Sequence, residues 1–446
     1  MATNRSFHFL SKPTNIAPLV FFRIAFGLLM FISILRFMLK GWVYSMYVMP
    51  KFHFPYYGFE WVQALPESFM YAFFGAMLIA CLGITFGFLY RVSAISFFIL
   101  FTYVELIDKT NYLNHYYFVS LISFLLIFTP ANKSFSLDNL LFKRNETTII
   151  PQFYILLIKV QLFLVYLFAG IAKINTDWLF NAQPLKMWLP AFSYYPIIGS
   201  YMEHDWVAYL FSWVGCLYDI LIGFFLFNKR TVHIAYVFVV IFHAATALFF
   251  NIGMFPYIMI VATVIYFKED FHGKIVSLLK KIVHYSNNNL REGSINYSNG
   301  LVYFFVLYFS VQCLLPFRYT LYSGNLFWTE QGYRFSWRVM LMEKAGTAFF
   351  YVKDSKSQKE SEVDNKQYLT YMQEKMMSTQ PDMMVDYAKF LKKEYEQMGY
   401  TNVTVRAQVF VTLNGLGTRE FIDSSVDLSR ESNSVFKNKN WIKQYE

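Results

Sequence analysis

Long apolar runs separated by short polar or aromatic connections extend from residue 17 to residue 316. The runs are 15 to 24 residues long, which is enough for a helix to cross a bilayer. About nine can be counted, at 17–39, 69–90, 92–107, 115–129, 149–172, 206–227, 232–250, 252–267 and 300–316. The pattern predicts a polytopic α-helical membrane bundle of about nine spans, with the lipid bilayer as its surroundings.

The pattern changes after residue 316. Residues 337–342 and 348–352 predict a β-hairpin, residues 366–377 and 381–398 predict helices, and residues 403–413 alternate apolar and polar positions before a turn. We therefore expect two domains, a transmembrane domain over residues 1–316 and a small α+β domain containing a β-sheet over residues 317–446.

The lysine and arginine positions predict how the spans are oriented. If the N-terminus is cytoplasmic, thirteen basic residues lie in inside segments and five in outside loops. The inside set is Arg5, Lys12, Arg91, Lys133, Lys143, Arg144, Lys229, Arg230, Lys268, Lys274, Lys280, Lys281 and Arg291, and the outside set is Lys40, Lys51, Lys109, Lys173 and Lys186. Because cytoplasmic loops carry the excess of Lys and Arg, an odd number of spans places the C-terminal domain on the extracytoplasmic side.

Composition agrees with a membrane protein and excludes other classes. The chain is 56% hydrophobic and 15% charged. Its net charge of +10 lies largely in loops between apolar runs, so we expect no nucleic-acid partner. The three cysteines, Cys81, Cys216 and Cys313, lie singly in apolar runs, and no spacing typical of a metal site accompanies them.

The fifth run ends by carrying a lysine, Lys173, into the apolar part of the pattern. Helical spacing places Lys173 on one face with Tyr166, while Ala169 and Gly170 leave a hollow beside the amine. Desolvation converts a lysine into a usable base near neutral pH. The alternative is an interfacial lysine paired with Asp177.

Other ionisable or polar residues interrupt the spans or lie next to them, namely Asp108, Asn114, His115, Asp219 and His243. Such groups on several spans predict one interior polar pocket. A proton-coupled transporter would use a similar set, and a non-catalytic scaffold for the C-terminal domain is a third possibility.

At these residues the chain resembles the vitamin K-dependent gamma-glutamyl carboxylase family, whose membrane part is the horizontally transferred transmembrane (HTTM) domain. In the membrane part the likeness rests on Leu106-Ile107-Asp108-Lys109-Thr110 with Asn114-His115, Phe168-Ala169-Gly170-Ile171-Ala172-Lys173 with Asp177-Trp178, Gln183-Pro184-Leu185 with Trp188-Leu189, Asp219 with Gly223-Phe224-Phe225-Leu226-Phe227, and Phe242-His243 with Ile252-Gly253-Met254-Phe255-Pro256-Tyr257. In the C-terminal part it rests on Trp328-Thr329, Tyr333 and Phe335-Ser336-Trp337.

The resemblance implies a reaction and residues for it. Lys173 would deprotonate reduced vitamin K (menaquinol or phylloquinol) with help from His115, and dioxygen would convert the quinol to its epoxide and generate a strong base. That base would deprotonate the γ-carbon of a glutamyl peptide, which carbon dioxide traps, and no metal takes part. By the same resemblance His243 is a second family histidine, and Trp328, Tyr333 and Trp337 belong to the segment associated with glutamate binding.

The chain also departs from the family's animal members. It has Ala172-Lys173 where they have two lysines, Arg334 and Arg338 where they have a small and an acidic residue, and Met342 where they have histidine. The quinone half of the site is thus matched better than the peptide half. The animal outer cysteine pair is absent, and we therefore expect a bacterial inner-membrane protein that uses menaquinol.

We predict that a reporter active only in the cytoplasm, fused after Glu446, gives no signal, because the bias of basic residues places the C-terminus outside. The measurement is reporter activity relative to the amount of stable fusion. A strong signal from a stable fusion would reverse the orientation.

Overall fold

The computed structural model describes residues 9–250, 252–286 and 297–445. All nine predicted spans are helical in it. Seven of the described helices are long and apolar enough to cross a membrane, and two are shorter. The long ones are α1 (Ala17–Leu39), α2 (Glu67–Phe86), α3 (Tyr90–Ile107), α6 (Phe153–Ala172), α9 (Asp205–Phe227), α10 (Val232–Phe249) and α13 (Asn299–Leu314), which continues into a 3₁₀ turn at Leu315–Leu321; the shorter ones are α4 (Asn114–Phe128) and α11 (Phe255–Thr263).

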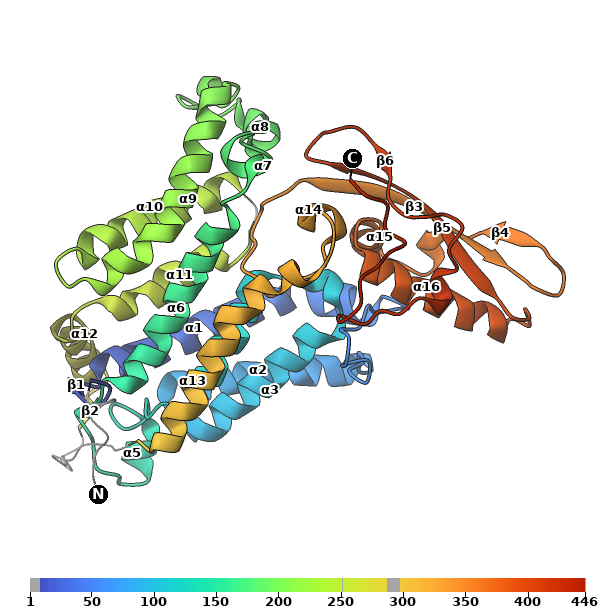
Figure 1. Cartoon of the computed structure of the whole chain (residues 1–446). Coiled ribbons are helices and arrows are strands. Elements are labelled where there is room, and N and C mark those ends of the chain that lie inside the picture. The colour runs from blue at the N-terminus through green and yellow to red at the C-terminus, as the bar shows by residue number, and fades with distance from the viewer. Residues whose placement is uncertain (1–8, 251, 287–296, 446) are drawn as a thin grey trace.

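The C-terminal domain covers one end of the helix bundle (Figure 1). The opposite end carries the N-terminal strand β1 (Pro13–Asn15), β2 (Ile149–Pro151), α5 (Leu137–Leu141) and the amphipathic helix α12 (Glu269–Ile282). There Lys280 donates to the buried Glu146 at 2.8 Å, which joins two segments predicted to be cytoplasmic.

Loops predicted to be outside lie together at the C-terminal domain. The amide of Gln373 donates to the carbonyl of Phe52 at 2.6 Å, and the amide of Asn414 donates to the carboxylate of Asp177 at 3.1 Å. The loop between α6 and α9 contains the short helices α7 (Thr176–Leu179) and α8 (Leu185–Trp188). These contacts agree with the predicted alternation of the spans.

The C-terminal domain is built on an antiparallel sheet of strand order β4-β3-β5-β6. The strands are β3 (Lys344–Lys353), β4 (Glu360–Glu362), β5 (Thr404–Leu413) and β6 (Arg419–Glu420), and the helices are α14 (Leu326–Thr329), α15 (Tyr371–Met377) and α16 (Pro381–Gln397). The predicted helix at 381–398 and the strand at 403–413 are confirmed with small changes of boundary, whereas the helix predicted at 366–377 is confirmed only over Tyr371–Met377.

The hairpin predicted across residues 344–346 is wrong. These residues begin β3, which pairs with β5 from Lys344↔Leu413 to Lys353↔Thr404. Residues 337–342 form no strand, and Trp337 and Met340 have positive φ angles of 60° and 54°, which an extended strand cannot contain. This segment instead packs against the membrane domain.

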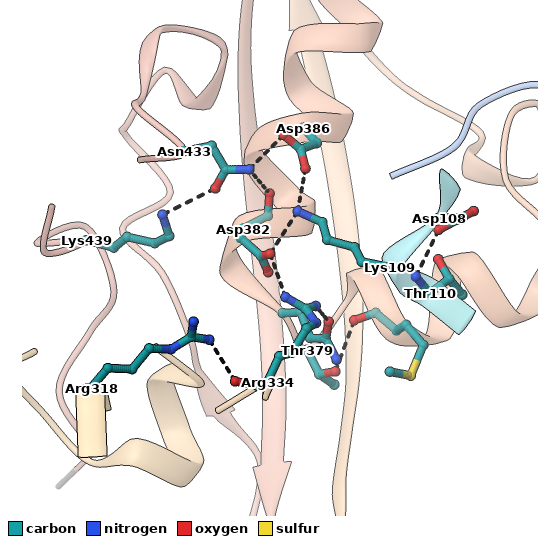
Figure 2. A network of polar contacts seen from close by, with 12 residues as sticks. Asp108, Lys109, Thr110, Arg318, Arg334, Thr379, Asp382, Asp386, Asn433 and Lys439 are labelled. Atoms are coloured by element: carbon teal, nitrogen blue, oxygen red, sulfur yellow. Dashed lines mark hydrogen bonds and ion pairs between the residues drawn. The ribbon is translucent and has the colours of Figure 1, made fainter. Parts of the chain in front are cut away.

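Lys109 docks the two domains (Figure 2). It lies between α3 and α4, its side chain is 2% exposed, and its Nζ is 2.8 Å from the carboxylate of Asp382 and 2.6 Å from that of Asp386, both in α16. On the preceding residue, the carboxylate of Asp108 accepts from the Gln373 amide at 2.8 Å. The loop between two membrane helices therefore fixes the C-terminal domain in place.

We predict that Lys109→Gln lowers the thermal unfolding midpoint in detergent, because it leaves the buried carboxylate of Asp386 without a cation, and breaking a buried pair costs about 3–5 kcal/mol. The matched control is Lys186→Gln. Lys186 also pairs with an aspartate, but that partner, Asp205, is 75% exposed, and such pairs contribute about 0–1 kcal/mol. Equal midpoints for the two variants would contradict a docking role for Lys109.

Candidate functional site

A cavity of about 380 Å³ lies among α6, α9, α10 and α11. Most of its wall is apolar or aromatic, and its polar side chains are Tyr166, Lys173, Tyr218, Asp219, His243 and Thr246. We call it the Lys173 cavity. It brings together four of the residues that the sequence singled out, namely Tyr166, Lys173, Asp219 and His243.

Lys173 forms a buried ion pair across two helices. It caps the C-terminus of α6, and its Nζ lies 2.6 Å from Oδ2 of Asp219 in α9. The same Nζ donates to the carbonyl of Ala169 at 3.2 Å. The lysine thus pairs with Asp219 and not with Asp177, whose carboxylate accepts hydrogen bonds elsewhere. A buried ammonium requires such a partner.

Gly170 allows α6 and α9 to approach closely enough for this pair. A Cβ at Gly170 would lie 2.7 Å from the backbone nitrogen of Ile220 and 3.1 Å from the carbonyl carbon of Asp219. The space beside Gly170 is therefore filled by α9 and is not part of the cavity. Ala169, in contrast, does line it.

Two hydrogen-bonding atoms of the cavity's side chains have no partner among the described residues, Oη of Tyr218 and Nδ1 of His243. The other ring nitrogen of His243 is 3.2 Å from Oη of Tyr166, which is also 3.1 Å from the hydroxyl of Thr263. Because buried polar groups are normally hydrogen-bonded, the two orphaned atoms are available to an ordered water or to a ligand with polar groups.

His115 lies behind the cavity wall. Its side chain is buried, and its ring centroid is 5.9 Å from that of Phe255, which does line the cavity. Phe255 also contacts the ring of His243 at 5.6 Å. His115 therefore does not line the cavity itself but contacts a residue of its wall.

Asn114 and Asp108 do not line the cavity, because both bind the C-terminal domain. The amide of Asn114 donates to the carbonyl of Arg338 at 2.8 Å, and its side-chain oxygen accepts from the hydroxyl of Tyr112 at 3.0 Å. That hydroxyl accepts from the backbone N–H of Phe335 at 2.7 Å. Asn114 is thus a positioning residue for the segment that follows α14.

That segment, residues 329–340, lies between two cavities. Val339 and Met340 line the Lys173 cavity, whereas residues 329–332, 334 and 335 line a second one. Phe335, Trp337 and Met340 all have positive φ, a conformation that non-glycine residues keep only where the surroundings hold them. The segment is therefore held in place by tertiary contacts.

The three aromatic residues of the predicted glutamate segment lie in different surroundings. Trp328 is buried in the C-terminal domain, where its Nε1 donates to the carbonyl of Lys443 at 2.8 Å. Trp337 is buried against Tyr117, with ring centroids 5.0 Å apart. Tyr333 packs against Phe327 and lines neither cavity. Their described contacts hold the segment in position.

The second cavity, of about 240 Å³, lies between the domains, and we call it the interdomain cavity. Its wall carries the Lys109–Asp382–Arg334 network (Figure 2). Burial alone would raise the pKa of Asp382, but the Arg334 guanidinium and the Lys109 ammonium outweigh it and hold this pKa well below its ordinary value. Burial lowers the pKa of Lys439, a further lysine of the wall.

Two family models together cover most of the chain. The HTTM domain matches residues 11–271, and the lumenal domain of vitamin K-dependent gamma-carboxylase matches residues 297–446. The chain belongs to the vitamin K-dependent gamma-carboxylase family. The resemblance stated from the sequence is thereby confirmed. No solved structure matches the chain.

Membership makes this a vitamin K-dependent carboxylase-like integral membrane protein. It favours an enzyme of carboxylase type over the transporter and the scaffold, and it implies vitamin K as cofactor and a glutamate-containing substrate. The Lys173 cavity fits the cofactor, because its aromatic walls suit a naphthoquinone ring and the orphaned atoms of Tyr218 and His243 suit quinol oxygens. Among the described residues no group of three His, Cys, Asp or Glu side chains could hold a metal ion.

Sequence reasoning missed several residues in and around the Lys173 cavity. Tyr218 adjoins Asp219 on a mid-span turn, so its position next to an intramembrane charge was an available signal. Thr263 and Met340 gave no such signal. Thr263 bonds to Tyr166 and Met340 lines the cavity only because elements far apart in the chain pack together.

We predict that Gly170→Ala destabilises the protein and separates Lys173 from Asp219, because the new methyl group would meet the backbone of α9 at 2.7 Å. Overpacking of this kind costs about 1–3 kcal/mol. The matched control is Gly75→Ala in α2, where an added Cβ meets nothing within 4 Å and helix propensity improves by up to about 1 kcal/mol. Thermal unfolding in detergent measures both, and a Gly170→Ala midpoint at or above that of the wild type would contradict this packing role.

Proposed function

We propose that this protein oxidises reduced vitamin K with dioxygen to the epoxide and couples that oxidation to the carboxylation of a peptide glutamate by carbon dioxide. The observation that carries the proposal is the buried Lys173–Asp219 pair in an aromatic cavity of about 380 Å³. The overall reaction converts quinol, dioxygen, carbon dioxide and a glutamyl residue into epoxide, water and a carboxylated residue, with release of one proton.

When bound, reduced vitamin K supplies the electrons that reduce dioxygen and, through its oxidation, a base strong enough to deprotonate the γ-carbon of glutamate. The ion pair first loses one proton, which leaves Lys173 as an amine beside the Asp219 carboxylate, and Nζ then takes the proton of a quinol hydroxyl. The ammonium that results is held by Oδ2 of Asp219, which lies 2.6 Å away, so the carboxylate stabilises the product of the proton transfer. Tyr218 and His243 orient the quinol through their unpartnered atoms.

The aromatic wall excludes water from this chemistry. Tyr218 stacks on Phe242 with ring centroids 4.0 Å apart, and Phe249, Phe250 and Phe255 complete the apolar lining. A carbanion at the γ-carbon survives long enough to meet carbon dioxide only if water cannot protonate it first. The lining therefore serves both halves of the reaction.

The segment at residues 329–340 supports coupling of the two halves. It lines the interdomain cavity with one part and the Lys173 cavity with the other. Trp328, Tyr333 and Trp337 then act by holding this segment against both domains. A glutamyl peptide bound at the extracytoplasmic domain would approach the quinol along it.

We predict that Lys173→Gln and Lys173→Arg each lower the rate of epoxide formation by at least about 100-fold, because loss of general-base catalysis costs about 10²–10⁴ in rate and a guanidinium cannot lose its proton in this pH range. The assay supplies purified protein with reduced menaquinone and dioxygen and follows the epoxide, with labelled bicarbonate to follow carbon fixation.

The control for these variants is Lys159→Gln. Lys159 is also in α6, but its ammonium lies 5.5 Å over the ring of Tyr266 and does not reach the Lys173 cavity. Lys173→Gln leaves Asp219 without a cation and could therefore disturb folding. The double variant Lys173→Leu, Asp219→Leu replaces the ion pair by two apolar side chains, so it should fold without a base at this position. Wild-type epoxidation in a folded Lys173 variant would rule out this lysine as the base.

A further inference from the structure

The interdomain cavity has more cations than carboxylates on its wall. The described residues that line it include the cations Lys109, Arg318, Arg334 and Lys439 and the carboxylates Glu330 and Asp382. Figure 2 shows Arg318 and Lys439 beside the Lys109–Asp382–Arg334 network. A partly buried wall with excess positive charge favours an anion.

The carboxylates of Asp382 and Glu330 already form ion pairs with cations other than Arg318 and Lys439. Asp382 lies 2.8 Å from Lys109 and 2.7 Å from Arg334, and Glu330 lies 3.0 Å from Lys344. The excess charge is therefore not neutralised within the described wall.

Arg318 and Lys439 carry that excess. Arg318 donates to the backbone carbonyl of Arg334 at 2.7 Å, while its Nε is buried without a partner among the described atoms. Lys439 donates to the side-chain oxygen of Asn433 at 3.3 Å. Neither forms an ion pair in the described part of the chain within 4.0 Å, and burying such charges is unfavourable until an anion meets them.

The surroundings of the two cations distinguish among anions. Tyr56, Tyr57 and Phe335 contribute aromatic surface to the same wall, which suits the methylene groups of an acidic side chain better than a fully hydrated inorganic ion. The cavity also shares the segment at residues 329–340 with the Lys173 cavity. Its ligand would therefore contact the same segment as a molecule in the Lys173 cavity without occupying that cavity.

We infer that the interdomain cavity is a carboxylate-binding subsite, in which Arg318 and Lys439 hold an acidic side chain of the peptide that neighbours the reacting glutamate. The inference rests on the proposed function only in naming that peptide as the substrate. It gives the enzyme a preference for peptides with clustered acidic residues, since a second carboxylate adds binding energy away from the reacting carbon.

The test measures binding of the peptide N-acetyl-Glu-Glu-Glu-amide to the full chain in neutral-lipid nanodiscs, without quinol. Its Gln-Gln-Gln counterpart should bind about tenfold more weakly or worse, because charge-assisted hydrogen bonds are lost. Lys439→Gln should weaken binding of the acidic peptide by a similar factor. Arg318→Lys should also weaken it, because the single ammonium cannot reproduce a forked contact.

The matched control is Lys437→Gln, since Lys437 is exposed, lies two positions from Lys439 and does not line the cavity. It should bind within about twofold of the wild type, because exposed charges outside the site contribute little. Wild-type affinity in a folded Lys439→Gln variant would overturn the inference. So would inorganic phosphate or anionic nanodisc lipid displacing the peptide at equal concentration, which would assign the cavity to phosphate groups. Because no quinol is present, these results are independent of epoxidation.

Discussion

Burial of two opposite charges between α6 and α9 is the constraint on which the rest of the site depends. Lys173 and Asp219 are both almost fully buried, and either one without the other would be an unpaired charge at membrane depth. The pair therefore requires the two helices to meet, and Gly170 is the position where they can. Once α9 is fixed in this way, α10 and α11 complete a cavity with a few polar side chains among aromatic and apolar walls.

The second constraint is the contact between the domains. Residues 335–340 contain three non-glycine positions with positive φ. This backbone donates a hydrogen bond to the Tyr112 hydroxyl and accepts one from the Asn114 amide. The adjacent residue pair Asp108 and Lys109 binds α15 and α16. One short loop of the membrane domain thus positions the segment that contributes to both cavities, so the site belongs to neither domain alone.

Some of the predicted polar residues line the Lys173 cavity and others do not, and their spacing in the sequence could not distinguish the two groups. Lys173, Asp219 and His243 lie on three spans, and their intramembrane polarity was sufficient to predict that they meet. Asn114 and His115 are neighbours in sequence, yet one binds the C-terminal domain and the other lies behind Phe255. Adjacent residues at the start of a helix point about 100° apart, and only packing decides what each direction meets.

The sequence by itself determined the nine helical segments, the mixture of helices and strands in the C-terminal part, and the family. These features follow from apolar run length and local motifs, which are properties of short stretches. The tertiary structure decided that Lys173 pairs with Asp219, that residues 337–342 form no strand, and that Arg318 and Lys439 line one cavity. Each of these outcomes joins residues far apart in the chain through side-chain packing and charge burial, and no local pattern records such contacts.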